Sequence, residues 1–164
     1  MSVARILATA AFACSMICEG VEWNDLSNEN WYSGRKLAPA DLKGKVVMVN
    51  EWGVMCPPCR AMLPRMEEAW KALKSKPFVL IGSHRQGRNP EEVRKIVREN
   101  NLTYPIYEQA GIANEPSGDG MLPFLYVIDA SGKVVYAGRS DRMAVAAVVG
   151  ALFEIETAAQ RRKF

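Results

Sequence analysis

The chain has 164 residues, of which 49% are hydrophobic and 24% are charged. This composition is typical of one soluble globular domain with a core of its own. The formal net charge is only +3 at pH 7, and the basic residues are spread along the chain apart from a cluster at residues 161–163. The charge therefore gives no indication that the protein binds nucleic acid.

The first twenty residues differ from the rest in composition. Arg5 precedes an apolar run over residues 6–17, and the next charged residue is Glu19. A short basic start followed by about a dozen apolar residues is typical of a secretory signal peptide, and the run is short for a transmembrane helix. We expect residues 1–18 to be a signal peptide or an N-terminal anchor, and residues 19–164 to form the folded domain.

Other interpretations of this segment stay open. Cys14 could be a lipoprotein processing site, although the residues before it depart from the usual pattern. In a retained core helix or strand, Cys14 and Cys18 would be buried or would form a second thiol pair. Export predicts a protein in the periplasm, or one anchored in the membrane and facing the periplasm. A retained segment leaves a cytoplasmic location open.

Residues 19–34 are typical of a polar connection with aromatic anchors, and residues 41–45 of a turn. The β-prone run over residues 46–52 predicts a buried central strand. After it, residues 57–75 predict a helix with one buried stripe, which Pro64 is expected to kink. The stripe has steps of three and four residues and consists of Leu63, Met66, Trp70 and Leu73.

Cys56, Pro57, Pro58 and Cys59 lie where this strand gives way to this helix. At a helix N-terminus, unpaired backbone N–H groups and the positive end of the macrodipole stabilise a thiolate, which lowers the pKa of Cys56. The prolines lack N–H groups that the first turn would leave unused, and their φ is already near helical. Cys59 returns to the same side one turn later. The spacing predicts a redox-active pair in which Cys59 resolves a mixed disulfide.

Two other interpretations of the pair are weaker. A structural zinc site needs two further ligands with matching spacing, and the remaining candidates are Cys14, Cys18 and the single histidine, His84. We therefore expect no metal. An inert disulfide would close a loop too short to gain much chain entropy.

The second half of the chain alternates strands and helices. We expect a strand over residues 78–82, a helix that Asn89 caps and that runs from Pro90 to about residue 100, and an extended piece over residues 104–107. A loop over residues 108–120, a hairpin of residues 124–129 and 133–137, and an amphipathic helix over residues 141–160 follow. This order predicts an α/β domain: a central mixed β-sheet with helices on both faces.

Two segments resemble a known family. The first covers residues 42–64, with Trp52-Gly53-Val54-Met55-Cys56-Pro57-Pro58-Cys59 at its centre, and the second covers residues 121–136, beginning Met121-Leu122-Pro123-Phe124. Together they resemble the signatures of the thioredoxin superfamily. They are most similar to the TlpA/ResA-type thiol-disulfide oxidoreductases, which are related to the AhpC/TSA proteins. The resemblance covers about residues 33–153 and implies a thioredoxin fold.

The resemblance also implies roles. Cys56 would be the attacking cysteine and Cys59 the resolving one. The Leu122–Pro123 bond would be cis, and Leu122, Pro123, Trp52 and Met55 would form the substrate-binding surface. The resemblance further implies a protein disulfide as substrate and an upstream electron donor in the membrane. We expect no cofactor and a monomer.

Four positions need separate interpretation. Met55 replaces the usual tryptophan before the first cysteine, and Met62 stands where many members carry a glutamate associated with proton transfer. Glu51 lies in the central strand, where a carboxylate is costly unless it is paired. Strand alternation turns it away from the dithiol, so we expect a structural role with a basic partner from a covering helix; an acid–base role is the alternative. For His84 we expect an exposed loop position, with a catalytic or substrate contact as the alternative.

The sequence thus predicts a thiol-disulfide oxidoreductase. A peroxiredoxin-like thiol peroxidase is the first alternative, although a second cysteine within one turn favours disulfide exchange. A redox-gated binding domain without turnover is the second alternative.

Overall fold

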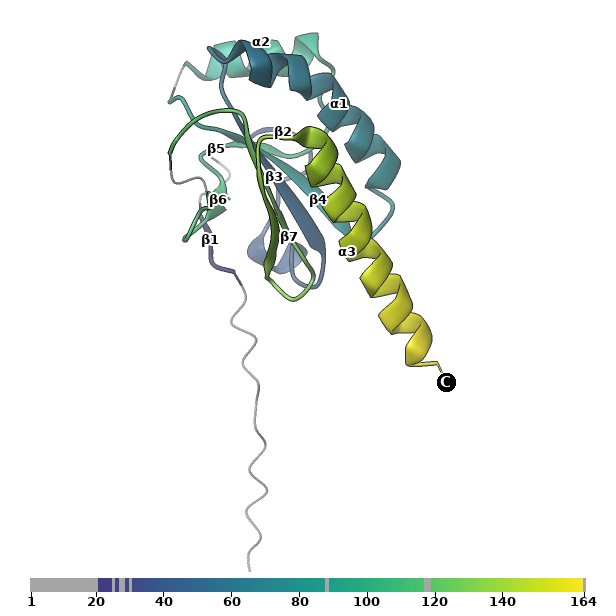
Figure 1. The fold of residues 1–164 in the computed structure, drawn as a ribbon. Helices are drawn as coiled ribbons and strands as arrows, with labels where there is room; N and C mark the ends of the chain where they lie inside the picture. Colours follow the sequence, from purple (N-terminus) through teal and green to yellow (C-terminus); the bar gives the residue numbers. More distant parts are fainter. Residues whose placement is uncertain are drawn as a thin grey trace, which may run out of the picture.

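The computed structural model describes residues 21–24, 26, 29, 31–87, 89–116 and 119–163. Residues 1–18, with the predicted signal segment and with Cys14 and Cys18, lie outside this part of the chain. Figure 1 shows a central sheet with α3 running alongside its β3–β7 region.

The main sheet has six strands in the order β2-β5-β4-β3-β7-β8. Strands β3, β4 and β5 are parallel, and β2, β7 and β8 each run antiparallel to their neighbours. Every residue of β3 and β4 is buried, as expected for continuous apolar runs in the centre of a sheet. The strands are β2 (Trp31–Ser33), β3 (Val46–Trp52), β4 (Phe78–His84), β5 (Ile106–Glu108), β7 (Phe124–Ile128) and β8 (Val134–Gly138).

Three α-helices follow the predicted ranges closely: α1 (Pro57–Leu73), α2 (Pro90–Glu99) and α3 (Asp141–Arg161). Each is preceded by a capping residue whose side chain accepts a backbone N–H, which satisfies an otherwise unpaired donor of the first turn. A short 3₁₀ helix, η2 (Pro39–Asp41), precedes β3. The three predicted helices, the central strand β3 and the hairpin of β7 and β8 are confirmed.

The two faces of the sheet are covered unequally. Buried residues of α1, α2 and α3 form one cluster with Met48 and Leu80. Val47 and Val49 face the other way, into a cluster with Leu37 and Leu42, which flank η2. The mixed sheet of a thioredoxin-like fold is confirmed. Its three α-helices, however, pack on one face, whereas we expected helices on both.

The order of the strands explains this arrangement. The crossovers from β3 to β4 and from β4 to β5 step across the sheet in the same direction. Because such crossovers are right-handed, both connecting helices lie on the same side. The opposite face is left to η2 and to the segment that carries the small sheet of β1 (Trp23–Asn24) and β6 (Gly111–Ile112).

Some strands were missed or shortened by the sequence interpretation. β1, β2 and β6 lie in segments expected to be connection or loop, and β4 continues two residues beyond its predicted end. Strands of two or three residues are too short to show an alternating pattern.

Helix α3 is long and apolar enough, by length and composition, to cross a membrane. Its inner residues pack in the same core cluster as those of α1 and α2. In the described fold α3 is therefore a covering helix of the sheet.

Candidate functional site

Cys56 and Cys59 form a disulfide at the start of α1, with their Cα atoms 5.2 Å apart. Cys56 caps the helix, and its Sγ accepts the backbone N–H of Cys59 at 3.3 Å. Cys59 is 1% exposed and Cys56 8%. The strand-to-helix position predicted for the pair is confirmed, and Cys56 is the more accessible of the two cysteines.

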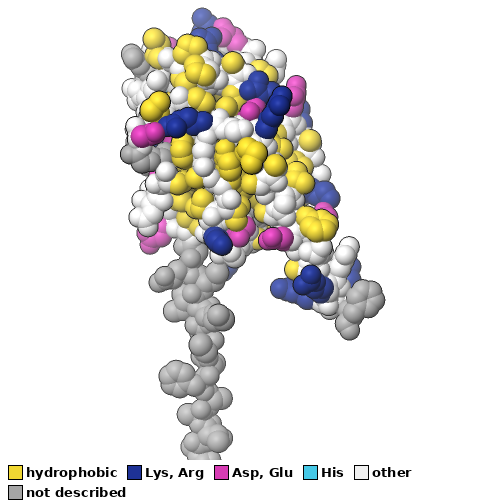
Figure 2. All heavy atoms as spheres, viewed as in Figure 1, with side chains coloured by type: hydrophobic (Ala, Val, Ile, Leu, Met, Phe, Trp, Pro, Cys, Tyr) yellow, Lys and Arg dark blue, Asp and Glu magenta, His cyan; other side chains and the backbone are white. Residues whose placement is uncertain are grey.

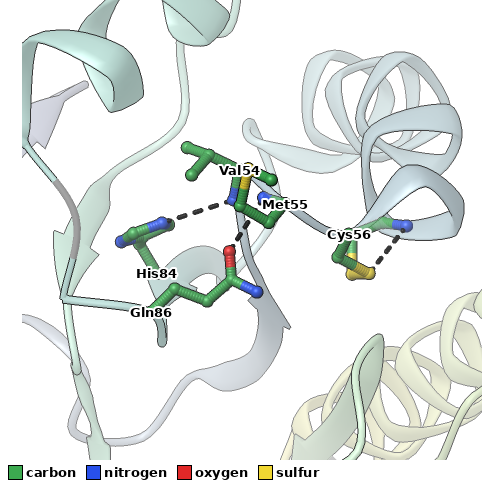
Figure 3. Close-up of a disulfide and its surroundings, with 6 residues drawn as sticks. Val54, Met55, Cys56, His84 and Gln86 are labelled. Carbon is green, nitrogen blue, oxygen red and sulfur yellow. Dashed lines mark hydrogen bonds between the residues drawn. A yellow bond between two sulfur atoms is a disulfide. The ribbon is translucent and has the colours of Figure 1, made fainter.

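Residues 53–55, the loop between β3 and α1, are held by side chains from the end of β4 (Figure 3). The backbone N–H of Val54 donates to Nε2 of His84 at 3.4 Å. The next N–H, that of Met55, donates to Oε1 of Gln86 at 2.8 Å. Two consecutive amides directly before the first cysteine thus have side-chain acceptors from one neighbouring segment.

The predicted substrate-binding residues lie at different depths. The Leu122–Pro123 bond is cis, as expected, and Leu122 packs against the core cluster that contains both cysteines. Met55 is strongly exposed. Trp52 is fully buried, and its ring meets that of His84 edge-on at 5.2 Å between centroids. Trp52 therefore lies behind the surface that Met55 helps to form.

The expectation that His84 is an exposed loop residue is wrong. His84 ends β4 and is fully buried, and Figure 2 shows no histidine side chain on the face in view. Its Nδ1 lies 2.6 Å from Oε2 of Glu108, which also accepts the hydroxyl of Tyr32 at 2.9 Å. Burial and the Glu108 carboxylate raise the pKa of Tyr32 to about 12. His84 is thus part of a polar cluster inside the domain.

Glu51 lies on the face of the sheet away from α1, as expected from strand alternation. It is 2% exposed, and the Nε of Arg85 lies 3.9 Å from its carboxylate. Arg85 also binds Glu115 through two hydrogen bonds of 2.9 and 2.7 Å. The predicted basic partner is therefore present, but it comes from the segment after β4 and not from a helix, because in the described part of the chain no α-helix covers this face.

Asn50 faces the opposite way, toward the helices. Its amide lies beside the hydroxyl of Tyr104, although neither group meets hydrogen-bond geometry with another described residue. Burial and the charge of Glu67 raise the pKa of Tyr104, against the effect of Asn50. Glu67, on α1, accepts the N–H and hydroxyl of Thr103 at 2.7 and 2.6 Å.

Sequence reasoning missed several members of the site: Gln86, Glu108, Arg85, Glu115 and Glu67. One signal could have found Gln86, Glu108 and Arg85, since polar side chains at the ends of parallel strands gather at the carboxyl edge of a sheet. Among the described residues, no group of three or more His, Cys, Asp or Glu side chains could hold a metal ion.

The chain is similar in sequence to two bacterial proteins. The chain is 34% identical over 103 residues to the thiol-disulfide oxidoreductase ResA of Bacillus thuringiensis (strain Al Hakam), a match covering 62% of this chain and 59% of that protein. It is 31% identical over 119 residues to the thioredoxin-like protein YneN of Bacillus subtilis (strain 168), covering 72% and 69%. Matches to the ResA proteins thus span less than two thirds of their length.

Solved structures agree on the fold. A thiol:disulfide interchange protein of the thioredoxin family from Chlorobium tepidum TLS has a TM-score of 0.61 and 26% identity, over 75% of this chain and 94% of that one. A DsbF homologue from Corynebacterium diphtheriae has a TM-score of 0.66 and 20% identity, over 81% and 86%. The second likeness, at this identity, shows the fold alone.

The family model of the AhpC/TSA proteins matches residues 22–137. The matched range holds the main sheet except the last residue of β8, and it holds α1 with both cysteines. With its ResA and YneN homologues and a thioredoxin-like fold around a CXXC disulfide, the chain belongs to the AhpC/TSA family.

Proposed function

We propose that this protein is a thiol-disulfide oxidoreductase that exchanges electrons with protein disulfides through Cys56 and Cys59. The observation that carries the proposal is the disulfide at the start of α1, where Cys56 Sγ accepts the N–H of Cys59. A sulfur in this position is stabilised as a thiolate by the helix N-terminus. The thiolate is the form that attacks a disulfide.

The exchange follows from these positions. In the reduced protein the Cys56 thiolate attacks one sulfur of a substrate disulfide, forms a mixed disulfide and releases the other substrate sulfur as a thiolate. The Cys59 thiolate then attacks Cys56 Sγ, so that the intramolecular disulfide forms again and the substrate leaves as a dithiol. Two electrons pass to the substrate. The reverse order oxidises a dithiol.

The substrate surface would surround Cys56. We assign to it the exposed Met55, the Leu122 backbone and Pro123, with the buried Trp52 supporting the loop from behind. Leu122 packs against the cluster of both cysteines, which supports its placement there. Glu51 takes a structural role in this proposal, because its carboxylate faces away from the dithiol and toward Arg85.

The compartment and partners belong to the same proposal. The composition of residues 1–18 supports export, with the domain of residues 19–164 in the periplasm as a monomer, either free or anchored. A reductant there needs an upstream electron donor, for which the resemblance suggests a membrane protein. Thiol trapping of the protein in cells tests this, since it gives the redox state of Cys56 and Cys59 and, by mass, the fate of the N-terminus.

Reduction of insulin by the purified protein tests the activity. We expect wild-type protein, kept reduced by dithiothreitol, to accelerate the reduction, and Cys56→Ser to be inactive. Peroxide consumption without insulin reduction would establish the thiol peroxidase instead. Activity in neither assay, together with a stable partner complex, would establish a binding domain.

A further inference from the structure

We propose that His84 is a positioning residue for the dithiol, and that it holds the loop before Cys56 only while its Nε2 is unprotonated. The inference rests on the proposed thiol-disulfide exchange. It assigns to His84 a role through the backbone of Val54, in place of a direct contact with substrate.

The hydrogen bonds around the ring define its protonation state. The backbone N–H of Val54 can only donate, so Nε2 of His84 must accept at 3.4 Å. The ring proton is then on Nδ1, which donates to Oε2 of Glu108 at 2.6 Å. Neutral His84, with this tautomer, satisfies both neighbours at once.

Glu108 is itself fixed, which leaves the ring little freedom to turn. The hydroxyl of Tyr32 donates to its Oε2 at 2.9 Å, and the N–H of Gly87 donates to its Oε1 at 3.0 Å. The ring of Trp52 packs edge-on against the histidine. Residues of β2, β3 and β5 therefore position a side chain of β4.

The loop that receives this support leads directly to the attacking cysteine. Val54 is two residues before Cys56, and the Cys56 N–H donates to the carbonyl of Gly53 at 3.1 Å. Of the two side chains that accept loop amides, only that of His84 contains an ionisable group. The two contacts thus form a matched pair in which only one depends on pH.

A second proton on the ring would remove the His84 contact. Nε2 would become a donor and would face the Val54 N–H, another donor. The other groups around the ring do not supply a new acceptor for Val54: Glu108 is already bonded to Nδ1, Tyr32 donates to Glu108, and the Arg94 guanidinium stacks over the Tyr32 ring at 5.3 Å. The loop would then hold Cys56 less firmly at the start of α1.

The pH dependence of Cys56 reactivity tests the proposal. In a Cys59→Ser background, the rate of reaction with a small aromatic disulfide is measured across the titration ranges of histidine and cysteine. His84→Leu removes the acceptor and should slow Cys56 at neutral pH by about three- to tenfold, the equivalent of one neutral hydrogen bond. His84→Gln keeps an acceptor oxygen without an ionisable ring. At neutral pH it should therefore react at a rate closer to that of the wild type. In acid, its rate should not show the additional fall in the histidine range, the acidic break, that we expect for the wild type.

Gln86→Ala is the matched control, because it removes the neighbouring loop acceptor without removing a titrating group. We expect it to slow Cys56 while it keeps the acidic break. Thermal melts of each variant identify any that fail to fold.

A second measurement needs no substitution at the site. In the reduced wild-type protein, NMR should show the Val54 amide shift following the titration of the His84 ring, with Nε2 as the unprotonated nitrogen at high pH. A Val54 amide shift that does not change as the His84 ring is protonated would overturn the inference. So would a folded His84→Leu protein with the wild-type pH profile. Failure of the wild type to reduce insulin would instead overturn the proposed function. The response of the Val54 amide shift to protonation of the His84 ring could still be measured in that case.

Discussion

The backbone N–H of Cys59 donates to Sγ of Cys56 across 3.3 Å, inside the first turn of α1. One cysteine of the pair thus supplies a hydrogen bond to the other, and the donor comes from the backbone. The contact belongs to the cap of the helix, because Cys56 is the residue that precedes its first turn. It distinguishes the two sulfurs, since Cys59 itself is one turn inside the helix.

The first prediction follows from this asymmetry. In reduced protein, Cys56 should titrate below a free cysteine's value of about 8.5, and Cys59, which is deeper, should titrate higher. Alkylation rates of Cys59→Ser and Cys56→Ser across a pH series measure the two values separately. An ordinary thiol pKa at Cys56 would count against its role as the attacking group.

The second prediction concerns the order of attack. Cys59→Ser should accumulate mixed disulfides with oxidised insulin through Cys56, because no second thiol releases them. Cys56→Ser should accumulate few, since the remaining sulfur is only 1% exposed in the folded protein. Non-reducing gels and mass spectrometry measure the complexes. Equal trapping by both variants would contradict the assigned order.

The third prediction concerns Glu51. Glu51→Gln should lower the free energy of unfolding by about 1–2 kcal/mol, less than the cost of breaking an isolated buried pair, because Arg85 also binds Glu115. Insulin reduction and the Cys56 pKa should stay close to wild type. Urea unfolding and the insulin assay measure the two effects. A stable Glu51→Gln protein with slow exchange would show that the carboxylate serves the chemistry instead.

The fourth prediction concerns the contact between α1 and α3. Asp141, the first residue of α3, binds Arg65 of α1. Burial acts to raise the pKa of Asp141, but the Arg65 guanidinium and nearby N–H groups lower it overall. Since the folded-state pKa lies below the unfolded one, the stabilisation is present above the unfolded value and is lost as pH falls below about 4.

Asp141→Asn should therefore destabilise the protein by about 0.5–1 kcal/mol at neutral pH, and the difference from wild type should shrink in acid. Urea unfolding at a series of pH values measures it. Glu156→Gln is the control, because its pair with Lys76 is exposed on both sides and at no helix N-terminus. A difference for Asp141→Asn that stays constant in acid would contradict the assignment.

The fifth prediction concerns Gly53. A Cβ at this position would lie 2.3 Å from Cδ of Gln86, whose Oε1 accepts the Met55 N–H. Gly53→Ala should thus displace Gln86 and destabilise the protein by about 1–3 kcal/mol. In a Gln86→Ala background the same methyl group has room. The double variant should be clearly more stable than the sum of the two single effects predicts, and additive effects would refute the contact.

Local patterns in the sequence predicted the parts of the site that are local in the chain. The apolar run of β3, the cap at Cys56 and the stripe of α1 all lie within about thirty residues of one another, so their order alone indicated a dithiol at a strand-to-helix junction. The hairpin after Pro123 was equally clear, because each of its strands is long enough to show β propensity.

The contacts that support the dithiol could not be predicted in this way. His84 and Gln86 lie 30 and 31 positions from the amides they bind, and a lone histidine after a strand has no pattern that separates an exposed from a buried position. The partner of Glu51 was expected on a helix because the alternation of strands and helices does not say which face each helix covers. That information lies in the order of the strands.

The tie between residues 53–55 and the end of β4 has a consequence for protein engineering. In this chain the CPPC segment cannot be transferred alone, because the amides of the loop before it donate hydrogen bonds to side chains at the end of β4 and just after it. A graft of residues 52–60 onto another thioredoxin-fold scaffold would leave the Val54 and Met55 amides without their acceptors. The smallest transferable unit therefore consists of two separate pieces of chain, and the second of them includes His84 and Gln86.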